Sequence, residues 1–327
     1  MKRKLGVMSF MVLSGAAFAA DEGIKVGGFV DAQFQWSKNK TTKPAKVANP
    51  ATNRFLVNDG AIYVGKTWGN GAEVLVDLPF SSVGTTTAIT PGLSKGQAFA
   101  KWQYENGFQW KMGQFDGLYG LEAQDTKDVV FSDQGLLYGY TPETHVGLDV
   151  GYAMSEMLNI HFLVADKQDT SNMPNSSPDL GVKVETKMDA ATAGVGALFF
   201  PGRNAAGGST GKRGYLVSAT AGTKMAGVAA DLELLFKKLG LGANEKTRWG
   251  AGLHLGYMVN EEVNFAARVE YTKLDKAKDM EVTVGPQYWM AKDFGIKLDY
   301  TYGDHKNTAA NTASKDHTIA LAALAKF

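Results

Sequence analysis

The chain has 327 residues, with 34 Lys and Arg against 33 Asp and Glu, a formal net charge of +1, and no cysteine. The near-neutral balance argues against nucleic acid as a partner, and the absence of thiols from the sequence excludes a disulfide-stapled scaffold and thiolate metal sites. Hydrophobic residues make up 44% of the chain and are interspersed with 38 glycines, so no run reaches the ~20 apolar residues of a transmembrane helix.

The N-terminus predicts a secretory signal peptide over residues 1–19. A basic start is followed by an apolar run from Leu5 to Leu13 and by the small-x-small motif Ala17-Phe18-Ala19. The apolar run is too short for a helix across ~30 Å of hydrocarbon. We expect cleavage after Ala19, which leaves 31 bases against 33 acids in the exported chain.

From Ile24 onward, apolar and polar residues alternate. Even positions between Ile24 and Trp36 are mostly apolar, and odd positions include Lys25, Asp31 and Gln33. The same pattern returns over residues 263–272 and 294–302. Because successive side chains of a strand point to opposite sides, this alternation predicts strands with one apolar and one polar face.

Short and long links between these strands also alternate. Seven tight turns are expected at residues 69–71, 105–107, 155–156, 187–189, 223–225, 260–261 and 291–293. Eight longer segments, rich in Gly, Asn, Lys and Thr, are expected near residues 37–53, 80–96, 116–143, 167–178, 201–213, 237–246, 273–279 and 303–314.

These links predict about sixteen antiparallel strands with both ends on the short-turn side. Short periplasmic turns, long extracellular loops and an even strand count are typical of outer-membrane barrels. A soluble β-sandwich is the alternative, but it needs no such asymmetry. We therefore predict an all-β fold: one transmembrane antiparallel β-barrel over residues 20–327. The strand from Phe55 to Trp68 has an ambiguous phase, so Asp59 and Lys66 are assigned to neither face.

The longest predicted loop, residues 116–143, is acidic. It carries one base, Lys127, and six carboxylates: Asp116, Glu122, Asp125, Asp128, Asp133 and Glu143. Large apolar residues also occupy three positions of the polar face: Phe29, Leu75 and Phe99. These three side chains could form a wall against which an inserted segment packs.

The stretch Lys111–Glu122, its continuation from Asp125 to Phe131, and Tyr140–Gly147 resemble the β-barrel porins of Gram-negative bacteria in the porin-2, or OmpL-like, group. The resemblance implies that loop 116–143 folds into the barrel as a constriction loop. It also implies a bacterial outer-membrane location, with small hydrophilic solutes and ions passing through the lumen. A homotrimer is the expectation from the porin class.

The alternation places charged residues of both signs in the lumen. The bases are Lys25, Lys101, Lys111, Lys183, Arg248, Arg268 and Lys297, and the acids are Asp31, Glu73, Asp77, Asp149, Glu185, Asp231, Glu233, Glu270, Glu281 and Asp299. Charged rings in a pore set ion preference. Ten acids against seven bases, with an acidic loop, predict a mild cation preference.

The final segment places apolar residues at every second position back from a terminal aromatic, including Ile319, Leu321 and Phe327. It resembles the closing strand of outer-membrane proteins. That resemblance implies that the barrel-assembly machinery reads these residues as an assembly signal.

No catalytic, cofactor or metal motif stands out. The five histidines show no metal-ligand spacing, residues 207–213 break the phosphate-binding-loop pattern, and Asp125 and Asp128 lack the rest of a calcium shell. The groups of a lipase or protease barrel are not identifiable either. We therefore predict a non-enzymatic diffusion porin; a substrate-selective channel and a plugged structural or adhesive barrel stay open as alternatives.

Overall fold

The computed structural model describes residues 23–43, 47–48, 50–82, 89–91, 96–166, 178–200, 214–239, 246–307 and 310–327. The predicted signal peptide and the predicted loop 201–213 lie outside these residues, as does nearly all of 167–178. In the described part of the chain, no helix is long and apolar enough to cross a membrane.

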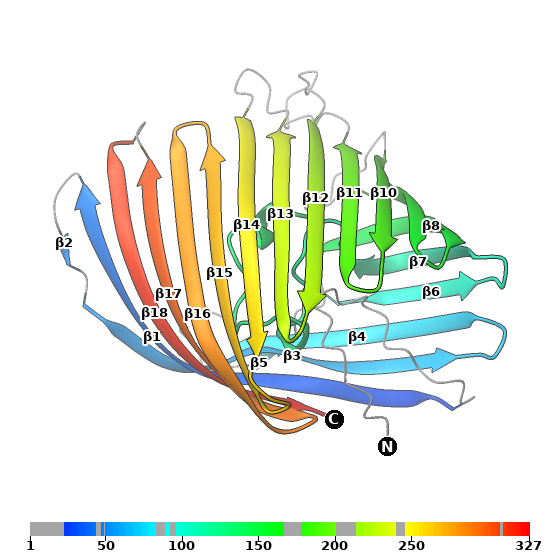
Figure 1. Ribbon diagram of the computed structural model, residues 1–327, viewed down its shortest axis with the longest axis horizontal. Helices are drawn as coiled ribbons and strands as arrows, with labels where there is room; N and C mark the ends of the chain where they lie inside the picture. The colour runs from blue at the N-terminus through cyan, green and yellow to red at the C-terminus, as the bar shows by residue number, and fades with distance from the viewer. Residues whose placement is uncertain are drawn as a thin grey trace.

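Sixteen long strands form the wall of the molecule (Figure 1). They are β1 (Lys25–Lys43), β3 (Thr52–Thr67), β4 (Ala72–Ser82), β6 (Ala98–Gln103), β7 (Phe108–Asp116), β8 (Thr144–Ser155), β9 (Leu158–Ala165), β10 (Asp179–Lys187), β11 (Ala191–Phe200), β12 (Gly214–Met225), β13 (Val228–Leu239), β14 (Lys246–Met258), β15 (Val263–Leu274), β16 (Ala277–Ala291), β17 (Phe294–Asn307) and β18 (Thr312–Lys326). Two short strands, β2 (Val47–Ala48) and β5 (Ile89–Pro91), and two 3₁₀ turns, η1 (Thr126–Asp128) and η2 (Tyr138–Tyr140), complete the described elements.

Every long strand pairs antiparallel with two neighbours, and the first strand closes the ring. Strand β1 pairs with β3 on one side and with β18 on the other, where Phe29 lies opposite Lys326. The predicted fold class, an antiparallel barrel of sixteen strands, is confirmed. Closure leaves no sheet edge, which is what a β-structure needs in order to span a lipid bilayer.

Burial follows the predicted alternation. On β1, Val26 is 67% exposed, whereas Asp31 and Gln33 are 1% and 3% exposed. On β18, Ile319 and Leu321 are 40% and 46% exposed, and Ala322 is fully buried. The apolar residues face outward and the polar ones inward, which is the reverse of a soluble β-protein.

Three predicted connections were wrong. The segment 303–314 is mostly strand, because β17 and β18 pair as far as Asn307 and Thr312. The turn placed at 223–225 lies at Ala226-Gly227, whose positive φ angles of 48° and 84° suit a two-residue hairpin turn. The segment 273–279 is not a long loop, because β15 and β16 pair as far as Leu274 and Ala277. The Lys- and Asp-rich composition of this segment indicated a loop. Most of the segment instead forms the ends of β15 and β16, where both faces of the strands are polar.

A β-bulge explains the ambiguous phase of the strand from Phe55 to Trp68. On β3, Asp59 lies opposite Asp31 and Val57 opposite Ala32, so Asn58 is an extra residue in the ladder. One extra residue switches the faces of the strand. Even positions face inward before Asn58, and odd positions, such as the buried Ala61, face inward after it.

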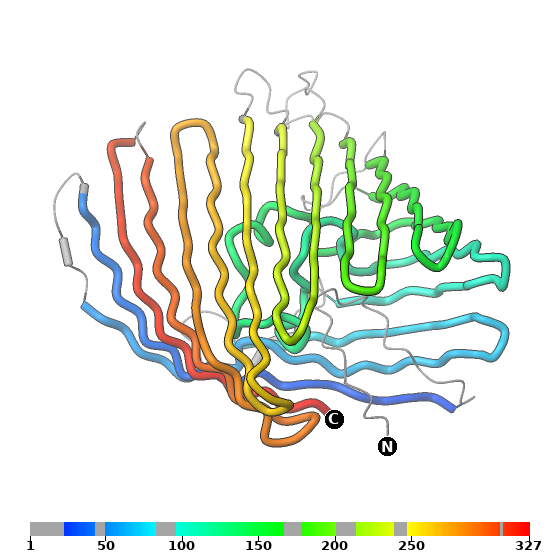
Figure 2. Tube along the Cα trace, in the orientation of Figure 1, coloured from blue at the N-terminus to red at the C-terminus, as the bar shows by residue number. Residues whose placement is uncertain are grey.

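The interior of the barrel is occupied by residues 117–143, which connect β7 to β8. Figure 2 shows this segment running inside the ring of strands rather than outside it. We call residues 117–143 the inner segment. It carries η1 and η2.

Candidate functional site

The two ends of the inner segment lie in close contact where the segment leaves the barrel wall. The backbone N–H of Gly117 donates to the carbonyl of Glu143 at 2.8 Å, next to the last β7 residue, Asp116. A Cβ atom on Gly117 would lie 1.8 Å from the carbonyl oxygen of Pro142. Glycine is therefore required where the two ends of the segment meet.

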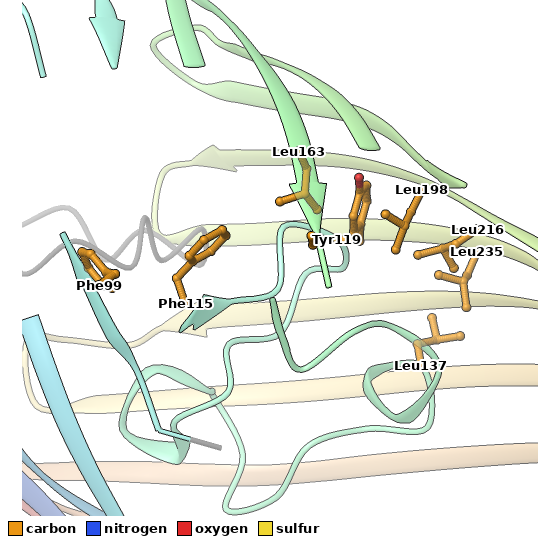
Figure 3. Close-up of a cluster of buried hydrophobic side chains, with 9 residues drawn as sticks. Phe99, Phe115, Tyr119, Leu137, Leu163, Leu198, Leu216 and Leu235 are labelled. Atoms are coloured by element: carbon orange, nitrogen blue, oxygen red, sulfur yellow. The ribbon is translucent and has the colours of Figure 1, made fainter. Parts of the chain in front are cut away.

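An apolar cluster fixes one side of the inner segment to the wall (Figure 3). Tyr119 and Leu137 of the segment pack against inward-facing leucines of β9, β11, β12 and β13: Leu163, Leu198, Leu216 and Leu235. The Tyr119 hydroxyl donates to the carbonyl of Ala197 at 3.1 Å. Added Cβ atoms at Gly181 and Gly196 would lie 2.2 and 2.7 Å from Tyr119. The wall is thus shaped for this ring.

The three apolar residues singled out in the sequence divide between two clusters. Phe99 belongs to the Tyr119 cluster, and Leu75 packs against it. Phe29 lies with Ala61 and Leu324 in a second cluster. The four wall leucines were not predicted from the sequence. They carry the same signal as Phe29, Leu75 and Phe99, because each is a large apolar side chain at an inward-facing position of its strand.

Wall carboxylates bind the backbone of the inner segment. Asp59, Glu233, Glu270 and Asp299 each accept a hydrogen bond from a segment N–H, those of Thr126 (2.9 Å), Leu121 (3.2 Å), Leu136 and Ser132 (2.6 Å) respectively. An irregular buried segment has N–H groups that no helix or sheet satisfies. The wall supplies the missing acceptors.

Wall donors bind the carbonyls of the same segment. The ammonium of Lys297 donates to the carbonyls of Thr126, Val129 and Phe131 at 2.9, 2.7 and 3.1 Å. Side-chain amides add further contacts: Gln33 and Asn58 donate to Ser132, and Gln287 donates to Val130. Side chains of the wall therefore bind both the N–H groups and the carbonyl groups of the inner segment.

Arg268 on β15 joins the segment to the wall through both terminal nitrogens of its guanidinium. It pairs with Glu122 of the segment at 2.5 Å and with Glu281 of β16 at 3.0 Å. It also donates to the carbonyl of Asp133 at 3.1 Å and lies 4.9 Å from the centre of the Phe131 ring. Only 2% of Arg268 is exposed.

A second group of charges surrounds η1. Asp125 accepts a hydrogen bond from the Tyr63 hydroxyl at 2.5 Å, and Lys127 lies 3.1 Å from Asp125 and contacts Asp128. Burial alone would lower the pKa of Lys127, but the two carboxylates outweigh burial and raise it. Lys127 therefore stays charged and neutralises part of the acidity of the segment.

Of the seven predicted lumen bases, Lys25 lies half-buried at the start of β1, and the other six fall into two groups. Four lie along the wall: Lys101 pairs with Glu73 (3.6 Å), Lys183 pairs with Glu185 (2.7 Å), Lys111 lies over the rings of Phe99 and Phe115, and Arg248 lies over the ring of Tyr140. Arg268 and Lys297 instead lie beneath the inner segment, each 2% exposed. The structure does not bring the six bases together.

Several predicted lumen acids are also covered. Glu233, Glu270 and Asp299 are 2%, 1% and 2% exposed, because they bind the inner segment. In the segment, Glu122 is paired with Arg268 and Asp133 is exposed, and Asp116 at the end of β7 is half-buried. The charges that a solute could meet are fewer than the alternation alone implied.

Cavities lie on both sides of the residues around η1. On the loop side, a cavity of about 250 Å³ is lined by Asp59, Asp125 and Tyr138, among others. On the turn side, one of about 200 Å³ is lined by Lys127, Lys224 and Lys326, with Asp128. Within the described ranges, no group of three His, Asp or Glu residues could hold a metal ion.

The end of the chain is built into the ring. Ile319 and Leu321 face outward on β18, and Phe327 follows that strand. The N–H and carbonyl of Phe327 pair with Gly28 of β1 at 3.0 and 2.9 Å. The aromatic terminus thus lies at the seam where the barrel closes.

Comparisons with known proteins agree with this architecture. A family model described as "Putative beta-barrel porin-2, OmpL-like" matches residues 23–326. No curated protein matches the sequence.

Three solved structures share the fold at low sequence identity. The outer-membrane channel DcaP of Acinetobacter baumannii has a TM-score of 0.67 at 11% identity, covering 94% of this chain and 100% of the other. An anion-selective porin from Comamonas acidovorans has 0.67 at 12%, covering 93% and 99%. The trimer form of OmpT, an outer-membrane protein of Vibrio cholerae, has 0.58 at 12%, covering 93% and 99%.

Proposed function

Because this chain belongs to the beta-barrel porin-2, OmpL-like family, we propose that it is a diffusion porin of the bacterial outer membrane. It conducts small hydrophilic solutes and ions through a water-filled lumen and catalyses no reaction. The observation that carries the proposal is the inner segment, which is held across the barrel from both sides. A segment fixed in this way narrows the lumen and does not swing on a hinge to close it.

The size limit of the channel depends on residues 117–143. In this proposal, Asp116, Glu122, Asp125, Asp128 and Asp133 belong to the constriction. Lys101, Lys111, Lys183 and Arg248 line the wall around it, while Arg268 and Lys297 support the segment from below. Swelling of protein-containing liposomes in graded sugars and amino acids tests the size limit. Swelling that falls steadily with solute size supports diffusion, and no swelling with any solute refutes it.

We also propose a mild preference for cations. The inner segment and Asp116 supply six carboxylates against Lys127, and one of the six, Glu122, is paired with Arg268. Pore charges act over about 8 Å at physiological salt. The reversal potential of a planar bilayer in a KCl gradient measures the preference, and a clear anion preference would contradict it.

Two other functions remain distinguishable. In a plugged structural or adhesive barrel, the hydrogen-bonded inner segment would close the lumen completely, and this alternative predicts no single-channel steps. A substrate-selective channel predicts saturable conductance block by one solute. Steps in KCl without saturation support the diffusion porin over both.

The assembly route is part of the proposal. Residues 1–19 direct export, and Ile319, Leu321 and Phe327 are read by the barrel-assembly machinery. A homotrimer is proposed by analogy with the trimer form of the Vibrio cholerae protein. Cross-linking in native outer membranes tests the trimer.

A further inference from the structure

The outward face of five adjacent strands changes from apolar to basic at one level. On β1 the outward positions run from Val26 through Phe34 to Trp36, and then to Lys38 and Lys40. The remaining outward lysines beyond the apolar positions are Lys273 on β15, Lys278 on β16, Lys306 on β17 and Lys315 on β18. All lie towards the loop end of the barrel (Figure 1).

Strand pairing brings these lysines together. Lys40 lies opposite Lys315 across the seam between β1 and β18. Lys306 lies opposite Lys278, and Lys278 lies opposite Lys273. The lysines therefore form a band over β15–β18 and β1, which we call the basic band. Across β17 and β18 the lysines are diagonal neighbours, because Lys306 lies opposite Ala313 and Lys315 opposite Asp304.

The basic band carries little compensating negative charge. Among the described outward positions of these five strands beyond the level of Trp36, Tyr271 and Tyr302, which we call the aromatic row, Asp304 is the one carboxylate, and it pairs with Lys306 at 2.7 Å. Lys315 lies 5.9 Å from the centre of the Tyr302 ring. Lys38, Lys40 and Lys315 are exposed. The band thus has a strong net positive charge.

The height of the band corresponds to the lipid headgroups. Val26 and Trp36 are ten residues apart on β1, which is about 33 Å along a strand and about 25 Å along the barrel axis at a tilt of about 40°. That is the height of the apolar belt of an outer-membrane barrel. Trp36, Tyr271 and Tyr302 mark its outer edge. The lysines begin one outward position beyond it on β1 and β15, and two positions beyond it on β17, where Asp304 comes first.

Several other strands remain apolar at their loop-side ends, and a single outward lysine, Lys238 on β13, lies there between Tyr215 of β12 and Thr247 of β14. Phe80 on β4, Val164 on β9 and Phe199 on β11 face outward at corresponding ends of their strands. The basic band is therefore local and is not a general property of the rim. We propose that it binds phosphate-bearing anionic lipids of the outer leaflet, with the aromatic row against the acyl chains and the ammonium groups on the phosphates.

Binding of a bis-phosphorylated lipid A to the folded barrel in neutral-detergent micelles tests this inference. The variant K38Q/K40Q/K315Q removes three charges from the band, and K66Q/K187Q/K292Q removes three charges at the turn side. Each ammonium near an anionic lipid surface contributes roughly a fivefold factor. We expect about hundredfold weaker binding for the first variant and unchanged binding for the second.

Two further binding measurements distinguish a lipid from other ligands. Dephosphorylated lipid A is expected to bind the wild type weakly, and millimolar inorganic phosphate is not expected to compete. Equal affinity of all three proteins, or indifference to the phosphates, overturns the inference. Competition by inorganic phosphate overturns the assignment to a lipid.

If the triple variant does not fold, the single variants K40Q and K315Q are each expected to lose about fivefold. Unchanged binding by both also refutes the inference. None of these outcomes depends on conductance, so the test is separate from the proposed channel function.

Discussion

Replacing Lys297 by Met should loosen the inner segment without removing the barrel. The buried ammonium makes three hydrogen bonds to segment carbonyls, at 2.9, 2.7 and 3.1 Å. Hydrogen bonds to charged groups contribute about 1.5–3 kcal/mol each, and removing one partner of a buried charged contact costs about 3–5 kcal/mol. The apolar replacement also removes the desolvation cost of the ammonium, so we expect a net loss of about 3 kcal/mol.

Two assays measure this effect in the folded protein. Denaturant unfolding in detergent micelles gives the change in free energy, and single-channel recording gives the conductance and its fluctuations. We expect lower stability, larger current noise and higher mean conductance for Lys297→Met. Lys187→Met, at an exposed turn-side position, is the matched control and should match the wild type. Wild-type stability and noise in Lys297→Met would refute the proposed role of the ammonium.

Three further changes test other parts of the structure. Deleting Asn58 removes the bulge, so the faces of β3 should conflict and folded, heat-modifiable barrel should fall several-fold on gels; normal levels would contradict the register argument. Gly181→Val should displace Tyr119, whose hydroxyl lies 2.2 Å from the added Cβ, and should alter conductance while the barrel still folds; an unchanged current would count against the cluster. Phe327→Glu should lower barrel levels in the outer membrane but leave the conductance of assembled channels unchanged, in contrast to Phe327→Tyr, which should assemble normally.

The barrel could be predicted from the sequence because its determinants are local. A period of two residues identifies each strand and its faces, and composition distinguishes most short turns from longer links, though not at residues 273–279. The strand of Asn58 shows the limit of this reasoning. A single inserted residue shifts the phase, and only the pairing partner, Asp31 opposite Asp59, reveals where.

The candidate site could be predicted less completely. Composition identified residues 116–143 as an unusual acidic loop, but the partners of that loop are far away in sequence. Lys297 reaches carbonyls near residue 129, and Arg268 reaches Glu122. Alternation shows that such side chains point inward, yet it cannot show whether they meet solvent or protein. For that reason, wall charges that bind the inner segment were interpreted as pore charges.

The most direct test of the account compares single-channel conductance with and without the inner segment. The variant replaces residues 119–140 by a short Gly/Ser link between Leu118 and Thr141, and heat-modifiable migration confirms that the barrel forms. We predict regular open steps for the wild type and steps several times larger for the variant. Silence of the wild type, or equal conductance of the two proteins, would contradict a diffusion channel narrowed by residues 117–143.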